Sequence, residues 1–154
     1  SLWQVTTDER MLLLGFADNS ESTRIHLTPG QRLPMLIGAG GRCIAAHSGF
    51  SRAELRRRFG ALRWETPLSF EAYLRDVETA RANGWGLDDG FYVRGVTSLA
   101  AGVRDGAGEV RFCVTCTCFR GRDDAALAEI GVQTRRAAAR IGQMLFGATP
   151  RPAR

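Results

Sequence analysis

Lysine is absent from this chain of 154 residues, and all 21 of its basic side chains are arginines. Apart from the run Arg56–Arg58, these arginines are scattered along the sequence, and they produce a formal net charge of +5. A nucleic-acid-binding surface instead gathers its basic residues on one face or along one helix. The scatter indicates a coding bias rather than a phosphate-binding surface, so we expect this chain not to contact DNA directly.

Long apolar runs are also missing. No apolar segment approaches the roughly 20 residues that span a bilayer, and the amino end has no signal-peptide pattern. We therefore expect a cytoplasmic protein with no membrane partner. The length and the 44% hydrophobic content suit one domain with its own core. Because the chain begins at Ser1 in strand-like sequence, we interpret it as a fragment of a longer protein.

Histidine is scarce, which bears on catalysis. His26 and His47 are the only histidines, and neither has a nucleophile at an interpretable spacing. Cys113 or Ser98 could serve as a nucleophile only with a base, and the sequence offers none nearby. We therefore predict that the chain is not an enzyme and needs no cofactor, with a small cytosolic enzyme as the alternative.

The four cysteines do not form a metal-binding pattern. Zinc needs about four ligands that converge tetrahedrally. On a strand, Cys113 faces away from Cys116 and Cys118, because successive side chains point to opposite faces. These three cannot close on one ion without a bulge, so we predict no metal site. Together with Cys43 they are expected to be small buried thiols in a reducing compartment.

Two consecutive strands, expected at 95–104 and 109–119, give the clearest sign of a binding site. Their side chains alternate between two faces. One face is bulky and apolar, formed by Leu99, Ala101, Val103, Val110, Phe112, Val114, Cys116 and Cys118. The other is small and rich in hydroxyls, formed by Val96, Ser98, Ala100, Gly102, Cys113, Thr115 and Thr117. Because these small side chains leave space above the sheet, we expect a small polar ligand there.

The order of elements predicts an α+β domain, a mostly antiparallel sheet with helices packed against it. Besides the two strands above, we expect a hairpin, a third strand, a short extended segment and an acidic turn, at 2–6 with 10–17, 23–27, 85–87 and 88–90. Helices are expected at 38–47, after the capping box of Ser51 and Glu54, at Phe70–Asn83, and from Asp123 or Asp124 to Phe146. The last helix should bury Leu127, Ile130, Thr134, Ala137, Ile141 and Leu145. Residues 1–147 would form the domain, and 148–154 a disordered tail.

The glycine-rich segment 33–47 also points to a ligand. Each glycine inside a helix costs about 1 kcal/mol relative to alanine, and a bare backbone indicates close approach of a ligand or a neighbouring element. The N–H groups and the positive dipole end at the start of helix 38–47 suit a carboxylate. The hydroxyls of Ser98, Thr115 and Thr117 can donate hydrogen bonds to the same ligand.

Three segments carry a resemblance to a known family. Residues 95–103, Gly-Val-Thr-Ser-Leu-Ala-Ala-Gly-Val, are similar to a signature Gly-Val-x-Cys-Ile-Ala-Ala-Pro-Val. Residues 79–86 with Asp88 resemble a helix end followed by an acidic turn. Residues 30–35 and 38–42 resemble the stretch Gly-x-x-x-Pro-Leu-His-x-Thr-Ala-x-Gly-Lys. In this order and spacing, the three resemble the C-terminal domain of IclR-type bacterial transcriptional regulators.

The resemblance implies a GAF/profilin-like, effector-binding domain that assembles as a homodimer or tetramer. It also implies a winged helix-turn-helix domain on the amino-terminal side, absent from this chain, through which the whole protein would bind operator DNA. Carried over onto this sequence, it implies the ligand-binding residues Ile25, Leu33, Ala39, Gly40, Asp88, Val96, Ser98, Thr115 and Thr117. Asp88 would either accept a hydrogen bond from a ligand hydroxyl or cap its own turn.

Departures from the family pattern bear on the ligand. The family's His and Thr near the helix start are Leu36 and Gly38 here, and its strand Cys is Ser98. Fewer polar groups there, with Phe91 and Tyr92 nearby, point to an apolar or aromatic part in the effector. We therefore predict a domain that senses a small organic acid or aromatic metabolite and modulates transcription. A GAF-type module of a signalling enzyme, binding a nucleotide or haem, is the second alternative, with the two histidines as its iron ligands.

Overall fold

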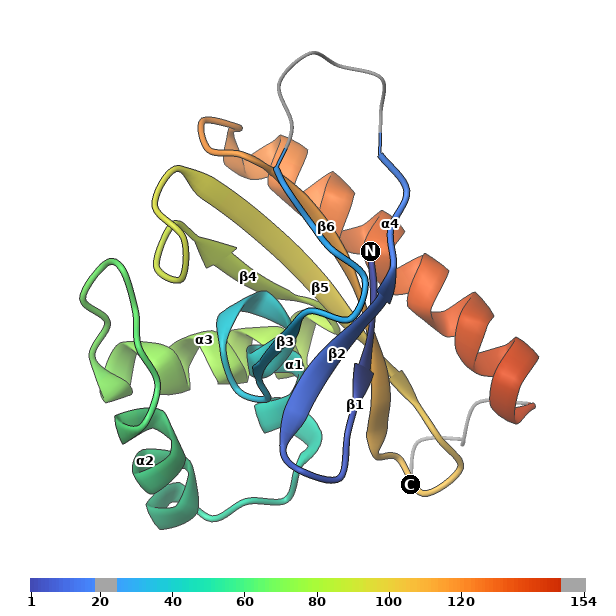
Figure 1. Cartoon of the computed structure of the whole chain (residues 1–154), viewed down its shortest axis with the longest axis horizontal. Coiled ribbons are helices and arrows are strands. Elements are labelled where there is room, and N and C mark those ends of the chain that lie inside the picture. Colours follow the sequence, from blue (N-terminus) through green and yellow to red (C-terminus); the bar gives the residue numbers. More distant parts are fainter. Residues whose placement is uncertain (19–24, 148–154) are drawn as a thin grey trace.

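The computed structural model describes residues 1–18 and 25–147, and its centre is a curled antiparallel sheet (Figure 1). The six strands follow the order β3-β2-β1-β6-β5-β4. Their bounds are β1 Leu2–Val5, β2 Arg10–Gly15, β3 Arg32–Pro34, β4 Gly86–Asp89, β5 Val96–Arg104 and β6 Val110–Phe119. Strand β6 pairs with β5 on one side and with β1 on the other. The predicted α+β class and antiparallel sheet are confirmed.

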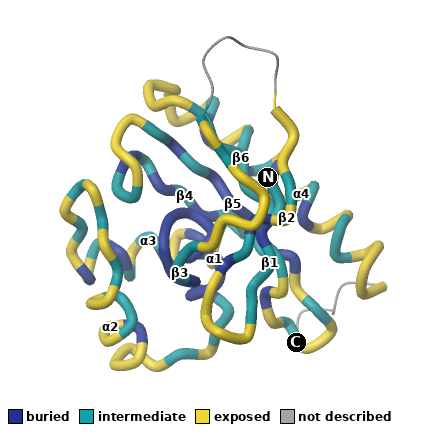
Figure 2. The backbone as a smooth tube through the Cα atoms, in the orientation of Figure 1, coloured by how far each residue is buried: buried dark blue, intermediate teal, exposed yellow. Residues whose placement is uncertain are grey.

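Helices cover both faces of this sheet. Helices α1, Gly38–His47, and α3, Phe70–Asn83, lie on one face, and α4, Asp124–Phe146, packs against β5 and β6 on the other (Figure 1). Helix α2, Arg52–Gly60, packs on the outer side, where the rings of Phe59 and Tyr73 lie 5.1 Å apart. Helix α1 is enclosed between the sheet and α3, and every residue from Gly38 to Ala46 is buried (Figure 2). One apolar core therefore surrounds a helix made largely of glycine and alanine.

Local signals set most helix ends. The side chain of Ser51 accepts a hydrogen bond from the N–H of Glu54, and Glu54 returns one, which confirms the capping box. Helix α3 begins after Ser69 and ends at Gly84, whose φ of 75° suits glycine in the left-handed region. Asp123 caps α4. Each of these three helices satisfies amide groups of its first turn with a side chain.

The third strand was predicted in the wrong place. Residues 25–27 belong to no strand, and residues 23 and 24 lie outside the described residues. Strand β3, Arg32–Pro34, takes the edge of β2 instead. The alternation that suggested a strand is real, since Ile25 and Leu27 are half-buried and His26 is exposed. Alternation alone does not decide which segment pairs with a neighbouring edge.

Two face assignments were also wrong. A register irregularity makes Val103 pair with Phe112 and Arg104 with Val110. Val110 therefore faces the α1 side, because a bulge reverses the alternation. Leu145, predicted to be buried, is 54% exposed near the end of α4, where the neighbouring Phe146 packs on Phe112 of β6 instead. The predicted tail 148–154 lies outside the described residues.

Candidate functional site

A cavity of about 140 Å³ lies between the first turn of α1 and the inner face of the sheet. Strands β5 and β6 form one side, and the β1–β2 hairpin with the segment before β3 forms another. The described residues around it are Trp3, Met11, Ile25, Leu27, Gln31, Leu33, Ile37, Gly38, Ala39, Gly40, Tyr92, Val93, Val96, Ser98, Thr115 and Thr117. None of these side chains carries a formal charge. The cavity is apolar except for hydroxyls, one amide side chain and the backbone of α1.

Eight of the nine residues predicted from the sequence line this cavity, and Asp88 does not. The eight are Ile25, Leu33, Ala39, Gly40, Val96, Ser98, Thr115 and Thr117. The structure thus brings together side chains from three distant segments. Sequence reasoning missed Trp3 and Met11, although both occupy inward positions of the predicted hairpin, where alternation would have indicated them.

Three hydroxyls face the cavity without a partner among the described residues. Ser98 on β5 lies directly opposite Thr117 on β6, and Thr115 lies one pair further along the same face. Within residues 1–18 and 25–147, the side chains of these three residues make no hydrogen bond. Polar groups lining a cavity normally find a partner in protein, water or ligand. These hydroxyls are therefore available to a bound molecule.

The start of α1 supplies further donors. Its N-cap is Ile37, which offers no side-chain acceptor, and the first turn holds no acidic residue. The N–H groups of Gly38, Ala39 and Gly40 precede the first intrahelical bonds and lie in buried residues at the cavity wall. The other described helices are capped by Ser or Asp side chains. Amides at a helix N-terminus form a site suited to a carboxylate or another oxyanion.

The glycines of α1 are explained mainly by close packing. A Cβ atom on Gly41 would lie 2.0 Å from the carbonyl carbon of Leu36, and one on Gly40 would lie 3.1 Å from the sulfur of Met11. These two glycines let the helix approach its neighbours. Gly38, with a φ of 64°, lies under the ring of Tyr92 at the cavity. Of the two causes named for these glycines, close approach to β2 accounts for Gly40, and close approach to the turn that leads into α1 accounts for Gly41.

Asp88 belongs to strand β4 and not to a turn, and it is 3% exposed. One of its oxygens accepts a hydrogen bond from Arg42 Nη1 at 2.9 Å. The other accepts from the backbone N–H of Tyr92 at 3.0 Å. Both carboxylate oxygens are therefore engaged by the protein. Asp88 was predicted to be either a ligand acceptor or a local cap, and its contacts match the second role, with Arg42 as an unforeseen partner.

Burial governs the ionisation of the groups near the cavity. It raises the pKa of the Cys43 thiol to about 12 and raises the pKa of Cys113 well above its usual value. Both thiols are therefore protonated at neutral pH and are poor nucleophiles. Burial, with the nearby carboxylates of Glu65 and Asp88, also raises the pKa of the Tyr92 phenol. Tyr92, the one of these three that lines the cavity, is thus a hydrogen-bonding group rather than a proton-transfer group near neutral pH.

The fold defines the class of the protein as a GAF/profilin-like α+β domain. The model of the family "bacterial transcriptional regulator IclR C-terminal" matches residues 4–143, so the chain belongs to this family. The resemblance inferred from the sequence motifs is thereby confirmed. The family and the structural neighbours are transcriptional regulators rather than enzymes.

Three solved structures illustrate the similarity. An IclR transcriptional regulator from Alicyclobacillus acidocaldarius is 22% identical, with a TM-score of 0.77, and the match covers 92% of this chain and 58% of that one. The repressor BlcR from Agobacterium tumefaciens is 21% identical with a TM-score of 0.76, over 96% and 59%. IclR from Thermotoga maritima is 15% identical with a TM-score of 0.77, over 95% and 60%. At these identities the likeness shows the fold.

This chain spans about three fifths of the length of those regulators. A search of curated protein sequences found no match. Among the helices in the described part of the chain, none is long and apolar enough to cross a membrane.

Proposed function

We propose that this chain is the effector-binding domain of an IclR-type transcriptional regulator and that its cavity binds a small organic acid with an apolar or aromatic body. One observation carries the proposal. Three partnerless hydroxyls and the uncapped amides of α1 converge on a cavity whose other walls are apolar. Donors at one side and apolar side chains at the others match a carboxylate joined to a hydrocarbon body.

The size of the cavity limits the ligand. An engineered cavity of about 150 Å³ in another protein binds benzene, and this cavity measures about 140 Å³. One aromatic ring or a short branched chain therefore fits, with the carboxylate directed towards the amides of Gly38–Gly40. Among the residues that the structure describes, no anionic side chain lines the cavity to repel the carboxylate. Arg42 neutralises Asp88, the nearest buried carboxylate on this face.

Regulation would follow from a shift between arrangements of the whole regulator. A ligand moves such an equilibrium only by its difference in affinity for the two states. We propose that a winged helix-turn-helix domain, in the part of the regulator not represented here, binds operator DNA. We further propose that the domain assembles as a cytoplasmic homodimer or tetramer, so that effector binding in one domain alters the geometry of the DNA-binding pair.

A thermal-shift screen with matched compounds tests the ligand proposal. Benzoate, phenylacetate, pyruvate and short branched keto-acids should include at least one that raises the melting temperature, because a ligand specific to the folded state stabilises it by mass action. The amide of the best acid should bind at least about tenfold more weakly, since it lacks the charge that the helix end favours. If acids and amides bind equally well, the proposed role of α1 is wrong.

Variants then test the hydroxyls. Ser98→Ala and Thr115→Val should each weaken binding of the best acid about 3- to 10-fold, which corresponds to a lost hydrogen bond of about 0.5–1.5 kcal/mol. Thr79→Val is the matched control, because its hydroxyl bonds to Arg75 O on the outer side of α3. All three proteins should unfold near the wild-type temperature without ligand. Unchanged affinity in both cavity variants would exclude this cavity as the binding site.

A further inference from the structure

The loop between β4 and β5 forms one wall of the cavity. Tyr92 and Val93 both line the cavity from this loop. A Cβ atom on Gly38 would lie 3.8 Å from Tyr92 Cδ1, so the ring covers the first residue of α1. The position of Tyr92 therefore sets the distance between this wall and the donors at the helix start.

Asp88 holds Tyr92 through the backbone. The N–H of Tyr92 donates to Asp88 Oδ2 at 3.0 Å, and this is the hydrogen bond that joins the middle of the loop to β4. Other groups hold the rest of the loop. Thr66 bonds to Gly90 O and Phe91 O, and the N–H of Arg94 donates to Glu65 Oε2 at 2.7 Å. The Phe91 carbonyl belongs to the same peptide group as the Tyr92 N–H, so removing the Asp88 carboxylate would free the Tyr92 side of this group while Thr66 still holds the other side.

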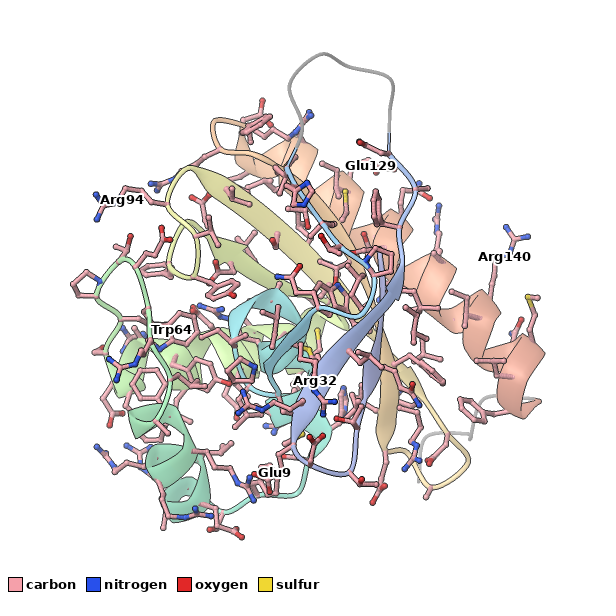
Figure 3. The ribbon with its side chains drawn as sticks, in the orientation of Figure 1. Glu9, Arg32, Trp64, Arg94, Glu129 and Arg140 are labelled. Carbon is pink, nitrogen blue, oxygen red and sulfur yellow. The ribbon has the colours of Figure 1, made fainter. Side chains whose placement is uncertain are left out.

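Arg42 in turn holds Asp88 from α1. Its guanidinium is fully buried, and it donates to Asp88 Oδ1 and to Asp76 Oδ2 of α3. The guanidinium carbon also lies 5.4 Å from the ring centroid of Trp64, which is labelled in Figure 3, and 5.6 Å from that of Tyr73. With ion pairs on two sides and rings near its carbon, this side chain has little freedom. It links α1, α3 and β4 at one point.

We propose that Asp88 is a positioning residue of the cavity: locked by Arg42, it holds Tyr92 over the start of α1 and thereby fixes the size of ligand that the cavity admits. The consequence for ligand size rests on the proposed function, whereas the positioning of Tyr92 does not. Asp88 is 3% exposed and is not among the described residues that line the cavity, so the proposed effect of Asp88 on the cavity runs through Tyr92.

The first experiment needs no ligand and uses the full chain of 154 residues. Asp88→Ala would leave the buried Arg42 charge without its buried partner, so the test variant is Arg42→Met with Asp88→Leu, which removes both buried charges together. Hydrogen exchange followed by NMR should show the Tyr92 amide exchanging about tenfold faster or more in the double variant. Contacts between the Tyr92 ring and the Gly38 α-protons should disappear from the nuclear Overhauser spectrum.

Asp89→Ala is the matched control. Asp89 neighbours Asp88 on the same strand, but its carboxylate bonds to Thr97 Oγ1 and Arg120 Nε rather than to the loop. It should keep the wild-type protection of Tyr92 and the ring contact. A folded double variant that also keeps both would overturn the proposal.

The second experiment measures whether the cavity prefers a smaller or a larger ligand, with benzoate and 2-naphthoate as probes. In the double variant, the ratio of the two affinities should move towards 2-naphthoate by about fivefold or more, because a released wall admits the larger ring system. A general loss of stability would weaken both acids in the same proportion and leave the ratio unchanged, which would refute the specificity role. If the wild-type chain binds neither acid nor any other carboxylate, the proposed function fails, and hydrogen exchange still decides whether Asp88 positions Tyr92.

Discussion

The ion pairs of Arg42 allow a direct test of how burial changes the strength of a salt bridge. One guanidinium contacts two carboxylates at nearly the same distance, Asp88 at 2.9 Å and Asp76 at 3.0 Å. The Asp88 side chain is 4% exposed and that of Asp76 is 39% exposed. The cation is shared, so the two pairs differ in the exposure of the carboxylate and in the number of bonds, because Asp76 accepts from Nε and Nη2 and Asp88 from Nη1 alone.

The expected losses of unfolding free energy differ severalfold between variants of Arg42 and of Asp76. Arg42→Met leaves the Asp88 carboxylate buried without its cation, which costs about 3–5 kcal/mol of unfolding free energy. For a domain of this size, the melting temperature should fall by about 6–20 °C. Asp76→Asn should cost about 1 kcal/mol or less, because water screens the exposed carboxylate. The double variant Arg42→Met with Asp88→Leu removes both charges and should cost only about 1–3 kcal/mol, mainly for the Tyr92 amide left without an acceptor.

Urea unfolding of these variants, together with Asp88→Leu alone, completes the cycle. Circular dichroism and tryptophan fluorescence should give coincident transitions, which validates the two-state treatment. The unfolding free energies lost in the two single variants should add up to far more than the loss in the double variant. Two results would refute it: an Arg42→Met loss below about 1 kcal/mol, or a double loss equal to the sum.

Two further predictions concern helix α1 and the pH dependence of stability. Gly41→Ala should prevent folding, seen as loss of helical circular dichroism, because the new Cβ would lie 2.0 Å from the carbonyl carbon of Leu36. Gly60→Ala, with nothing within 4 Å, is its control and should be tolerated. Burial lowers the pKa of His47 in the folded chain. As the pH falls below about 6.5, the unfolded chain therefore takes up a proton at His47 before the folded chain does, and the free energy of unfolding decreases. His47→Gln should therefore lose less unfolding free energy between pH 7.5 and 5.0 than wild type or the exposed-site variant His26→Gln, and equal losses would contradict the assignment.

The site could be predicted to the extent that local periodicity determines it. Thr115 and Thr117 share a face because side chains alternate along one strand. Ser98 joins them because β5 and β6 pair with Ser98 opposite Thr117, as the predicted hairpin implied. The family motifs added residues from other segments, and Ala39 and Gly40 line the cavity as the resemblance implied. The role of Asp88, unlike that of these cavity residues, could not be predicted. It depends on Arg42, 46 positions earlier in the chain, and no local pattern indicates such a partner.

In the fold, too, features set by nearby residues were predicted, and features set by contacts between distant segments were not. The bounds of α3 and the capping box of α2 were predicted correctly, since capping residues act within a few positions of the helix ends. Strand β3 was not, because β2 can pair with any extended segment that reaches its edge. Val110 was assigned to the wrong face because the irregularity near Arg104 is a property of the paired strands and not of either strand alone.

By itself, the sequence determined which side chains of one strand share a face wherever the alternation is regular, where the capped helices begin, and to which family the motifs point. These features depend on residues within a few positions of one another, where steric and hydrogen-bonding preferences act directly. Only the tertiary structure decided that Ile25 joins the cavity wall without being in a strand, and that Arg42 neutralises Asp88. Both outcomes depend on contacts between segments that are far apart in the sequence. Such contacts form, and stabilise the protein, only when the sheet and α1 have packed together.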